Sequence, residues 1–167
     1  MSGQLSPNAL ALIALCNEFC QAAELAAEST CDDFTATMTR LLPRIYISAQ
    51  DVPVNVLAGE SYIPASLDED YYDAIRRNIE TVLGENDTYL EVFEQDMKFS
   101  DTPIGASVAE SLADLFQVFY NFINAIKDAP DDIINECLNA LSEDFAGYWS
   151  QILVNVMRPL NAIRHHC

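Results

Sequence analysis

Four carboxylate side chains form the pattern in this chain that is best suited to chemistry. Glu91 and Glu94 stand one helical turn apart, and Glu110 and Asp114 form a second such pair further along. Mg²⁺ and Mn²⁺ prefer oxygen ligands, so two neighbouring helices that carry these pairs would offer them a binding site. The sequence therefore holds one candidate metal site made of four carboxylates.

This arrangement resembles the motif of all-α nucleotide pyrophosphohydrolases, in which E-x-x-E is followed at a distance by E-x-x-D. The first half matches as EVFE at 91–94, whereas Asp114 follows Glu110 by four residues instead of three. The resemblance implies a hydrolase that depends on Mg²⁺ or Mn²⁺. No group of basic residues stands nearby to hold substrate phosphates, since Lys98 is isolated. We therefore favour a solvated acidic face and keep the hydrolase as the alternative.

Other catalytic chemistry has little support in the sequence. The two histidines, His165 and His166, stand at the end of the chain, and no nucleophile elbow, P-loop or dinucleotide fingerprint is present. Cys16 and Cys20 stand at i,i+4, without the C-x-x-C spacing or the further ligands of a zinc site. We expect these thiols to pack in the core, and we predict no catalytic residues.

The net charge bounds the partners of this protein. The 167 residues include 26 acidic and 8 basic ones, a formal charge of −18. Between Glu85 and Met157 fourteen residues are acidic and two, Lys98 and Lys127, are basic, and the acidic ones are spread through amphipathic segments. Such a field repels phosphate backbones and anionic membranes and attracts basic proteins. We predict a basic protein partner and no direct binding of nucleic acid or membranes.

The N-terminal apolar run, residues 9–16, is not typical of a secretory signal. The first basic residue is Arg40, whereas a signal carries positive charge ahead of its apolar core. No apolar stretch approaches the length of about 18 residues that a membrane span needs. We expect a cytoplasmic protein, and its length predicts a single domain over 1–167.

Capping residues divide the N-terminal part into helices. Ser6 before a proline predicts a helix that runs to about Glu28. Thr30 begins a second helix, which Pro43 should kink or end near Leu42. Each start is followed by apolar residues at helical spacing, so both segments are predicted to pack on a common core.

The middle of the chain combines clear and ambiguous signals. Ser66 and Glu69 form a capping box for a third helix, which Gly84 should end. The apolar residues of 85–101 fit one helical face, although residues 89–93 also fit a short extended piece. We favour a short helix here.

The C-terminal part is the most regular. Ser107 begins a helix to about Lys127, and apolar residues then recur every three to four positions from Ile133 to Ile163. The latter segment is one long helix or two with a break near Ser142. Without a clear strand pattern, the chain is predicted to be all-α, a bundle of about five to seven helices.

Aromatic residues offer a further candidate pocket. Six of them are dense enough to line one, but at helical spacing aromatics are more often core, which we favour: Phe116, Phe119, Tyr120, Phe122, Tyr148 and Trp149. Three tyrosines beside the long irregular stretch 50–65 are better candidates for exposure and partner contact: Tyr62, Tyr71 and Tyr72.

Three segments resemble a bacterial family, the domain of unknown function 5063. They read GENDTYLEVFEQDMKFSD at 84–101, ASVAESLADLFQVFYNF at 106–122 and YWSQILVNVMRPL at 148–160. The similarity covers nearly the whole chain. It implies a small cytoplasmic α-helical protein and brings no catalytic residues. Our leading hypothesis is an interaction or adaptor module that acts through its acidic surface.

Overall fold

The computed structural model describes residues 5–53, 61–90 and 105–166, without the side chain of His166. It confirms an all-α fold, with six α-helices and one small sheet in these residues. The elements, in chain order, are α1 (Pro7–Glu24), a 3₁₀ turn (Ala26–Glu28), α2 (Cys31–Gln50), α3 (Glu69–Leu83), a second 3₁₀ turn (Gly84–Asp87), β1 (Thr88–Leu90), β2 (Gly105–Ser107), α4 (Val108–Ile126), α5 (Asp131–Asp144), a π-helix (Phe145–Trp149) and α6 (Ser150–His166).

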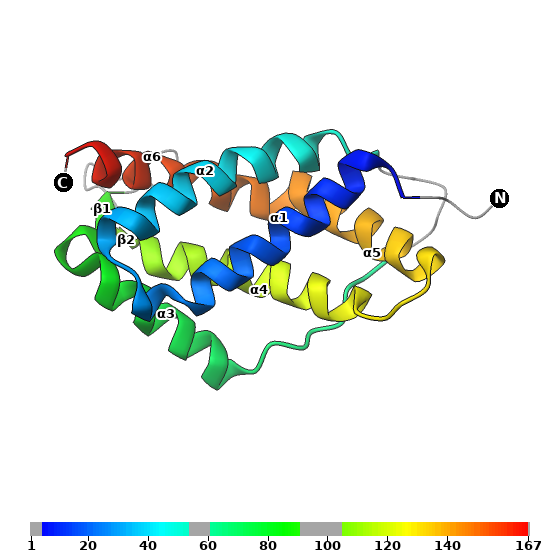
Figure 1. Ribbon diagram of the computed structural model, residues 1–167, viewed down its shortest axis with the longest axis horizontal. Helices are drawn as coiled ribbons and strands as arrows, with labels where there is room; N and C mark the ends of the chain where they lie inside the picture. The colour runs from blue at the N-terminus through cyan, green and yellow to red at the C-terminus, as the bar shows by residue number, and fades with distance from the viewer. Residues whose placement is uncertain (1–4, 54–60, 91–104, 167) are drawn as a thin grey trace, which may run out of the picture.

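Helix α4 lies at the centre of the bundle (Figure 1), where it contacts α1, α3, α5 and α6. Its Phe119 ring meets Phe19 of α1 and Trp149 edge-on, with centroid distances of 5.1 Å in both pairs. These three side chains are fully buried. Because α4 buries aromatic rings against several neighbours at once, it positions the four helices that it contacts.

Three of the predicted helix starts are confirmed. The hydroxyl groups of Ser6, Thr30 and Ser107 each accept a hydrogen bond of 3.1 Å from the backbone N–H three residues on. Gly84 ends α3 as expected, with a positive φ of 57° that a side chain would disfavour. Each of these caps and stops is formed by residues within one turn of one another.

The predicted capping box of Ser66 and Glu69 is wrong. Asp68 is the N-cap of α3, and its carboxylate accepts from the N–H of Asp70 at 3.0 Å. Ser66 instead donates to the side-chain oxygen of Asn121 on α4, from its N–H at 3.1 Å and its hydroxyl at 3.2 Å. Ser66 therefore makes a tertiary hydrogen bond in place of the capping bond that the local pattern predicted.

Pro43 lies inside α2, which continues to Gln50, so the alternative that the helix ends near Leu42 is wrong. The residues on both sides of the proline, Leu42 and Ile45, are fully buried. Their packing holds the segment helical past the missing N–H, whose loss removes one hydrogen bond.

The short helix predicted for 85–101 is wrong at Thr88–Leu90, where the extended alternative holds. Thr88–Leu90 is extended and pairs antiparallel with Gly105–Ser107, with Tyr89 opposite Ala106. The buried Asp87 carboxylate accepts from Ser107 Oγ and from the N–H of Ala109, both at 2.7 Å. These two hydrogen bonds tie Asp87 to the start of α4, and the chain that follows Asp87 is therefore held extended. Residues 91–101 lie outside the described part.

Towards the C-terminus, the alternative of two helices is correct. The π-helix Phe145–Trp149 separates α5 from α6, three residues beyond the predicted break at Ser142. The thiols of Cys16 and Cys20 are buried in the core as expected. Among the described residues, no helix is both long and apolar enough to cross a membrane.

Candidate functional site

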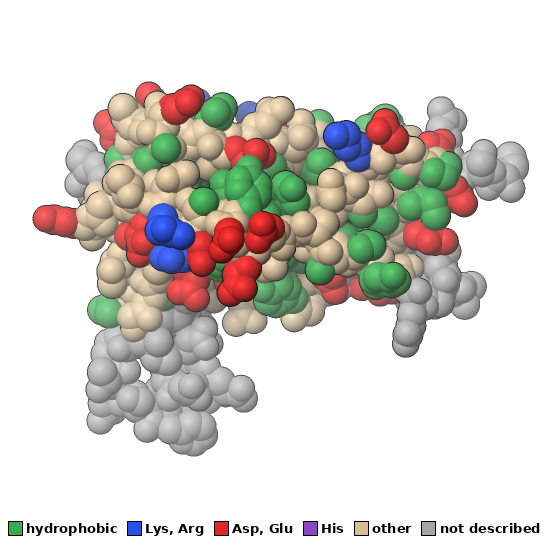
Figure 2. Space-filling view, turned by 90° about the horizontal axis from the view of Figure 1, so that it is seen from below, with side chains coloured by type: hydrophobic (Ala, Val, Ile, Leu, Met, Phe, Trp, Pro, Cys, Tyr) green, Lys and Arg blue, Asp and Glu red, His purple; other side chains and the backbone are tan. Residues whose placement is uncertain are grey.

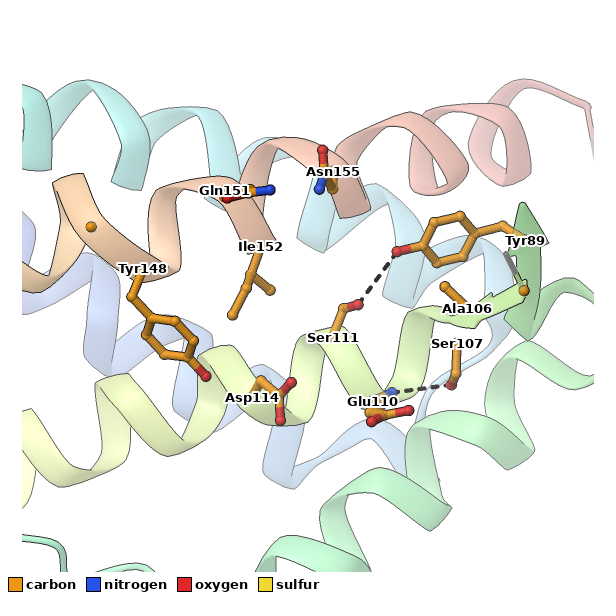
Figure 3. Close-up of a pocket in the computed structure, with 12 residues that line it drawn as sticks. Tyr89, Ala106, Ser107, Glu110, Ser111, Asp114, Tyr148, Gln151, Ile152 and Asn155 are labelled. Carbon is orange, nitrogen blue, oxygen red and sulfur yellow. Dashed lines mark hydrogen bonds between the residues drawn. The ribbon is translucent and has the colours of Figure 1, made fainter. Parts of the chain in front are cut away.

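A pocket of about 450 Å³ opens between α4 and α6, beside the small sheet (Figure 3). Its lining is mostly polar and carries two carboxylates, two phenols and two carboxamides. The described residues that line it are Tyr89, Gly105, Ala106, Ser107, Glu110, Ser111, Asp114, Gly147, Tyr148, Gln151, Ile152 and Asn155.

Helical spacing explains both walls of this pocket. Ser107, Glu110 and Asp114 follow one another at intervals of three to four residues, so they share one face of α4. On the opposite wall, the π-helix directs Phe145 and Trp149 into the core, while Tyr148 lines the pocket. A π-turn inserts an extra residue into a helix and is common at functional sites.

Asp114 is the most strongly held carboxylate of the pocket. The hydroxyl of Tyr72 on α3 donates to its Oδ1 at 2.5 Å. Burial raises the pKa of Asp114, and the hydrogen bond from Tyr72 opposes this shift without cancelling it. Burial, followed by the same bond, raises the pKa of Tyr72. The pocket thus contains a partly desolvated carboxylate in a fixed orientation.

Tyr148 reaches into the pocket from the other wall. Its hydroxyl is directed toward Asp114 (Figure 3), and its pKa is raised by burial and by the Asp114 charge. Tyr148 is 52% exposed, so its ring is accessible to a ligand. Tyr148 and Asp144 also line a neighbouring cavity of about 190 Å³, which places a third carboxylate on the other side of this residue.

The sheet closes one end of the pocket through Tyr89. The hydroxyl groups of Tyr89 and Ser111 lie 3.4 Å apart, and the Arg158 guanidinium lies 5.7 Å from the centroid of the Tyr89 ring. Arg158 also donates a hydrogen bond to the carbonyl of Leu90. Cation–π and hydrogen-bond contacts therefore hold β1 in place from α6.

Half of the predicted metal site can be located. Glu110 and Asp114 line the same pocket, whereas Glu91 and Glu94 lie outside the described residues. Within the described part of the chain, no group of three His, Cys, Asp or Glu side chains is arranged to hold a metal ion. The four-carboxylate site therefore stays a prediction.

The predicted exposure of three tyrosines is correct for Tyr62, which is 79% exposed, and wrong for the others. Tyr71 packs edge-on against Phe116, with a centroid distance of 5.8 Å, and donates to Glu24 at 2.6 Å. Tyr72 donates to Asp114. Two adjacent tyrosines at a helix start do not indicate that carboxylates on α1 and α4 will accept hydrogen bonds from their hydroxyl groups.

The six aromatics proposed as core divide as follows. Four are fully buried: Phe116, Phe119, Phe122 and Trp149. Tyr120 is partly buried against them, whereas Tyr148 lines the pocket. The π-turn that separates Tyr148 from its buried neighbours has no signature in the sequence, so the core interpretation is wrong for Tyr148 and the pocket alternative holds for it.

Acidic side chains outnumber basic ones on the face shown in Figure 2. Another acidic region lies along α5 and the turn before it. We name its six exposed carboxylates the α5 acidic surface: Asp128, Asp131, Asp132, Glu136, Glu143 and Asp144. No basic residue stands among them in the sequence. Ion pairs within the described residues involve Arg76 of α3, which contacts Asp73 and Glu80. The α5 acidic surface has no such cation partner there.

Comparison with known proteins identifies the family. A crystal structure of protein BF1032 from Bacteroides fragilis is similar, with a TM-score of 0.81, 25% identity and coverage of 97% of this chain and 95% of that chain. No curated protein matches the chain. The model of the family described as "Domain of unknown function (DUF5063)" matches residues 4–166. Because that match spans nearly the whole sequence, the chain belongs to this family.

Proposed function

We propose that this protein is an interaction module whose α5 acidic surface binds a basic segment of another protein. The observation that carries the proposal is the set of six exposed carboxylates between Asp128 and Asp144, without a basic residue among them. A cationic partner surface is the natural complement of such an array, since opposite potentials steer and orient two proteins during encounter.

Part of this charge has a role within the protein itself. Asp131 and Asp132 stand in the first turn of α5, where the helix dipole favours negative charge. Glu136 stands four residues after Asp132, and like charges at this spacing repel one another. Burial, followed by the charge of Glu143, raises the pKa of Asp144. The charges beyond the first turn thus oppose folding, and a bound cation would relieve them.

A pair of charge-matched variants tests the proposal. One variant neutralises the surface beyond the first turn (Glu136→Gln, Glu143→Gln, Asp144→Asn). The control neutralises three exposed carboxylates elsewhere (Glu18→Gln, Glu28→Gln, Asp51→Asn), which gives the same net charge. A partner captured from the native cell is identified and purified, and its Kd is measured for the three proteins.

We expect the α5 variant to lose about tenfold or more in affinity and the control to lose much less. Wild-type binding should also weaken from about 0.1 M to about 1 M salt, which shortens the Debye length from about 10 Å to about 3 Å. Equal losses in both variants, or affinity that does not respond to salt, would contradict the role of the α5 acidic surface.

A second candidate function is a divalent-metal-dependent hydrolase. The observation in its favour is that Glu110 and Asp114 line one pocket. The sequence motif would add Glu91 and Glu94 as ligands, and waters and substrate phosphates would complete the octahedral coordination of Mg²⁺. The response of the melting temperature to Mg²⁺ or Mn²⁺, compared between wild type and Glu94→Gln, distinguishes this candidate from the interaction module.

A further inference from the structure

The lining of the pocket between α4 and α6 selects for the charge of its ligand. Two carboxylates, Glu110 and Asp114, contribute to it, and no Lys or Arg is among the described residues that line it. Among the described lining residues, a phosphate or carboxylate ligand would meet two like charges and no cation. A positively charged ligand would meet two carboxylates, with neutral polar groups around them.

The geometry points to an aliphatic primary amine as the ligand, bound with its ammonium group at Asp114 and beside the ring of Tyr148. An ammonium group donates three hydrogen bonds, and the carboxylate of Asp114 and neutral oxygens around it supply acceptors. In this proposal the positive charge also contacts the exposed Tyr148 ring. Ile152, on the same wall, gives the alkyl chain an apolar contact.

The site is also organised before a ligand arrives. Tyr72 holds the Asp114 carboxylate through a bond of 2.5 Å, and Tyr148 stands on a π-turn whose two ends, Phe145 and Trp149, are anchored in the core. Trp149 is fixed further, because its indole N–H donates to the carbonyl of Leu141 at 3.0 Å. A ligand therefore loses little affinity to the ordering of these side chains.

A third carboxylate lies in the adjoining cavity. Asp144 and Tyr148 line the adjoining cavity, whereas Asp114 and Tyr148 line the main pocket. A linear diamine that passes Tyr148 would place one ammonium group at Asp114 and the other at Asp144. The preferred ligand is accordingly a linear aliphatic diamine, with a monoamine of the same chain length as the weaker one.

The test measures binding of 1,5-diaminopentane and 1-aminopentane to the purified full chain by isothermal titration calorimetry. Sodium chloride and Mg²⁺ at matched ionic strength show what general screening does. Three substitutions each remove one carboxylate: Asp114→Asn in the pocket, Asp144→Asn in the adjoining cavity, and Asp51→Asn, an exposed control at the end of α2. Tyr148→Leu removes the ring and leaves the bond between Tyr72 and Asp114 intact.

We expect Asp114→Asn to weaken both amines about tenfold or more, and Asp51→Asn to weaken them less than about twofold. Asp144→Asn should weaken the diamine and leave the monoamine unchanged. Tyr148→Leu should weaken both about two- to fivefold, as loss of a partly exposed cation–π contact implies. Because no protein partner takes part, the result is independent of the interaction proposed for the α5 acidic surface.

Three outcomes would overturn the inference. One is no heat of binding for either amine beyond that of sodium chloride at matched ionic strength. Another is an equal loss in Asp114→Asn and Asp51→Asn, which would show that the amines respond to net charge alone. The last is tight binding of Mg²⁺ that displaces the amine, since the pocket would then be a metal site.

Discussion

Removing the Tyr72 hydroxyl should destabilise the protein through the loss of one hydrogen bond. The bond from Tyr72 to Asp114 measures 2.5 Å and joins α3 to the central helix α4. A hydrogen bond to a charged group contributes about 1.5–3 kcal/mol to stability. Both side chains are partly exposed, so solvent screening brings the expected cost of Tyr72→Phe to about 1–2 kcal/mol.

A double-mutant cycle isolates this bond from other effects of each substitution. Tyr72→Phe, Asp114→Asn and the double variant are unfolded with urea at neutral pH, and the coupling free energy is taken from the four stabilities. We expect a coupling of about 1–2 kcal/mol. Asp114→Asn alone should cost less than Tyr72→Phe, because it also removes a partly desolvated charge whose pKa is raised by burial.

The same bond predicts a difference at alkaline pH. The pKa of Tyr72 is raised in the folded state, so the native protein keeps a proton that the unfolded chain loses above about pH 10. The stability that Tyr72 contributes is therefore complete below that pH and is lost as the pH rises through the folded pKa. The stability gap between wild type and Tyr72→Phe should narrow accordingly.

Tyr62→Phe is the matched control, since this tyrosine is 79% exposed and should change stability by less than about 0.5 kcal/mol. A coupling below about 0.5 kcal/mol between Tyr72 and Asp114 would refute the reasoning. So would a gap between wild type and Tyr72→Phe that does not narrow above about pH 10.

Three further measurements test the capping carboxylate, the core thiols and the metal site. Asp87→Ala should lower the free energy of unfolding by about 1–3 kcal/mol in urea, since it leaves the N–H of Ala109 without its acceptor, and a loss below about 0.5 kcal/mol would contradict this role. Cys20, whose pKa burial raises to about 12, and the buried Cys16 should resist a thiol reagent in the native protein; mass spectrometry that finds either one labelled as fast as a free thiol would sink this prediction. Millimolar Mg²⁺ or Mn²⁺ should raise the melting temperature of wild type and Glu94→Gln alike; a gain of roughly 2.7 kcal/mol at a hundredfold excess over Kd, absent from the variant, would favour the hydrolase instead.

Most of the fold could be predicted from the sequence because its signals are local. The hydroxyl caps at Ser6, Thr30 and Ser107 and the stop at Gly84 involve residues within one turn of each other, and all four are confirmed. The errors arise where a distant residue decides. Ser66, which the local pattern assigned to a capping box, donates its hydrogen bonds to Asn121 on α4 instead.

The extended piece at Thr88–Leu90 shows the same limit in another form. Its apolar spacing fits a helix, and only the pairing with Gly105–Ser107 favours the strand. The carboxylate that fixes this pairing, Asp87, is only 6% exposed. Nothing in the sequence distinguishes this buried aspartate from the many exposed acidic residues. A short strand gains its hydrogen bonds from a partner remote in the chain, so a window of neighbouring residues cannot reveal it.

Only one wall of the candidate pocket could be predicted from the sequence, for a related reason. Helical spacing alone places Glu110 and Asp114 together on α4, and the structure confirms that both line one pocket. The opposite wall depends on the π-turn at Tyr148, and the hydrogen bond to Asp114 depends on α3 packing beside α4. Neither is encoded in a short motif, because each results from how helices fit against one another.

The two proposed binding surfaces differ in how far water screens them, and salt therefore separates them. The α5 acidic surface is exposed, so its attraction for a basic partner acts through water and should weaken steeply as the Debye length shortens. Asp114 is partly desolvated, and an ammonium group in contact with it is screened much less. The affinity of 1-aminopentane, which engages Asp114 alone, should fall less with salt than partner affinity does, although both ligands carry positive charge. If the two fell in parallel, the amines would be binding to the outer surface, and the pocket would have no part in their recognition.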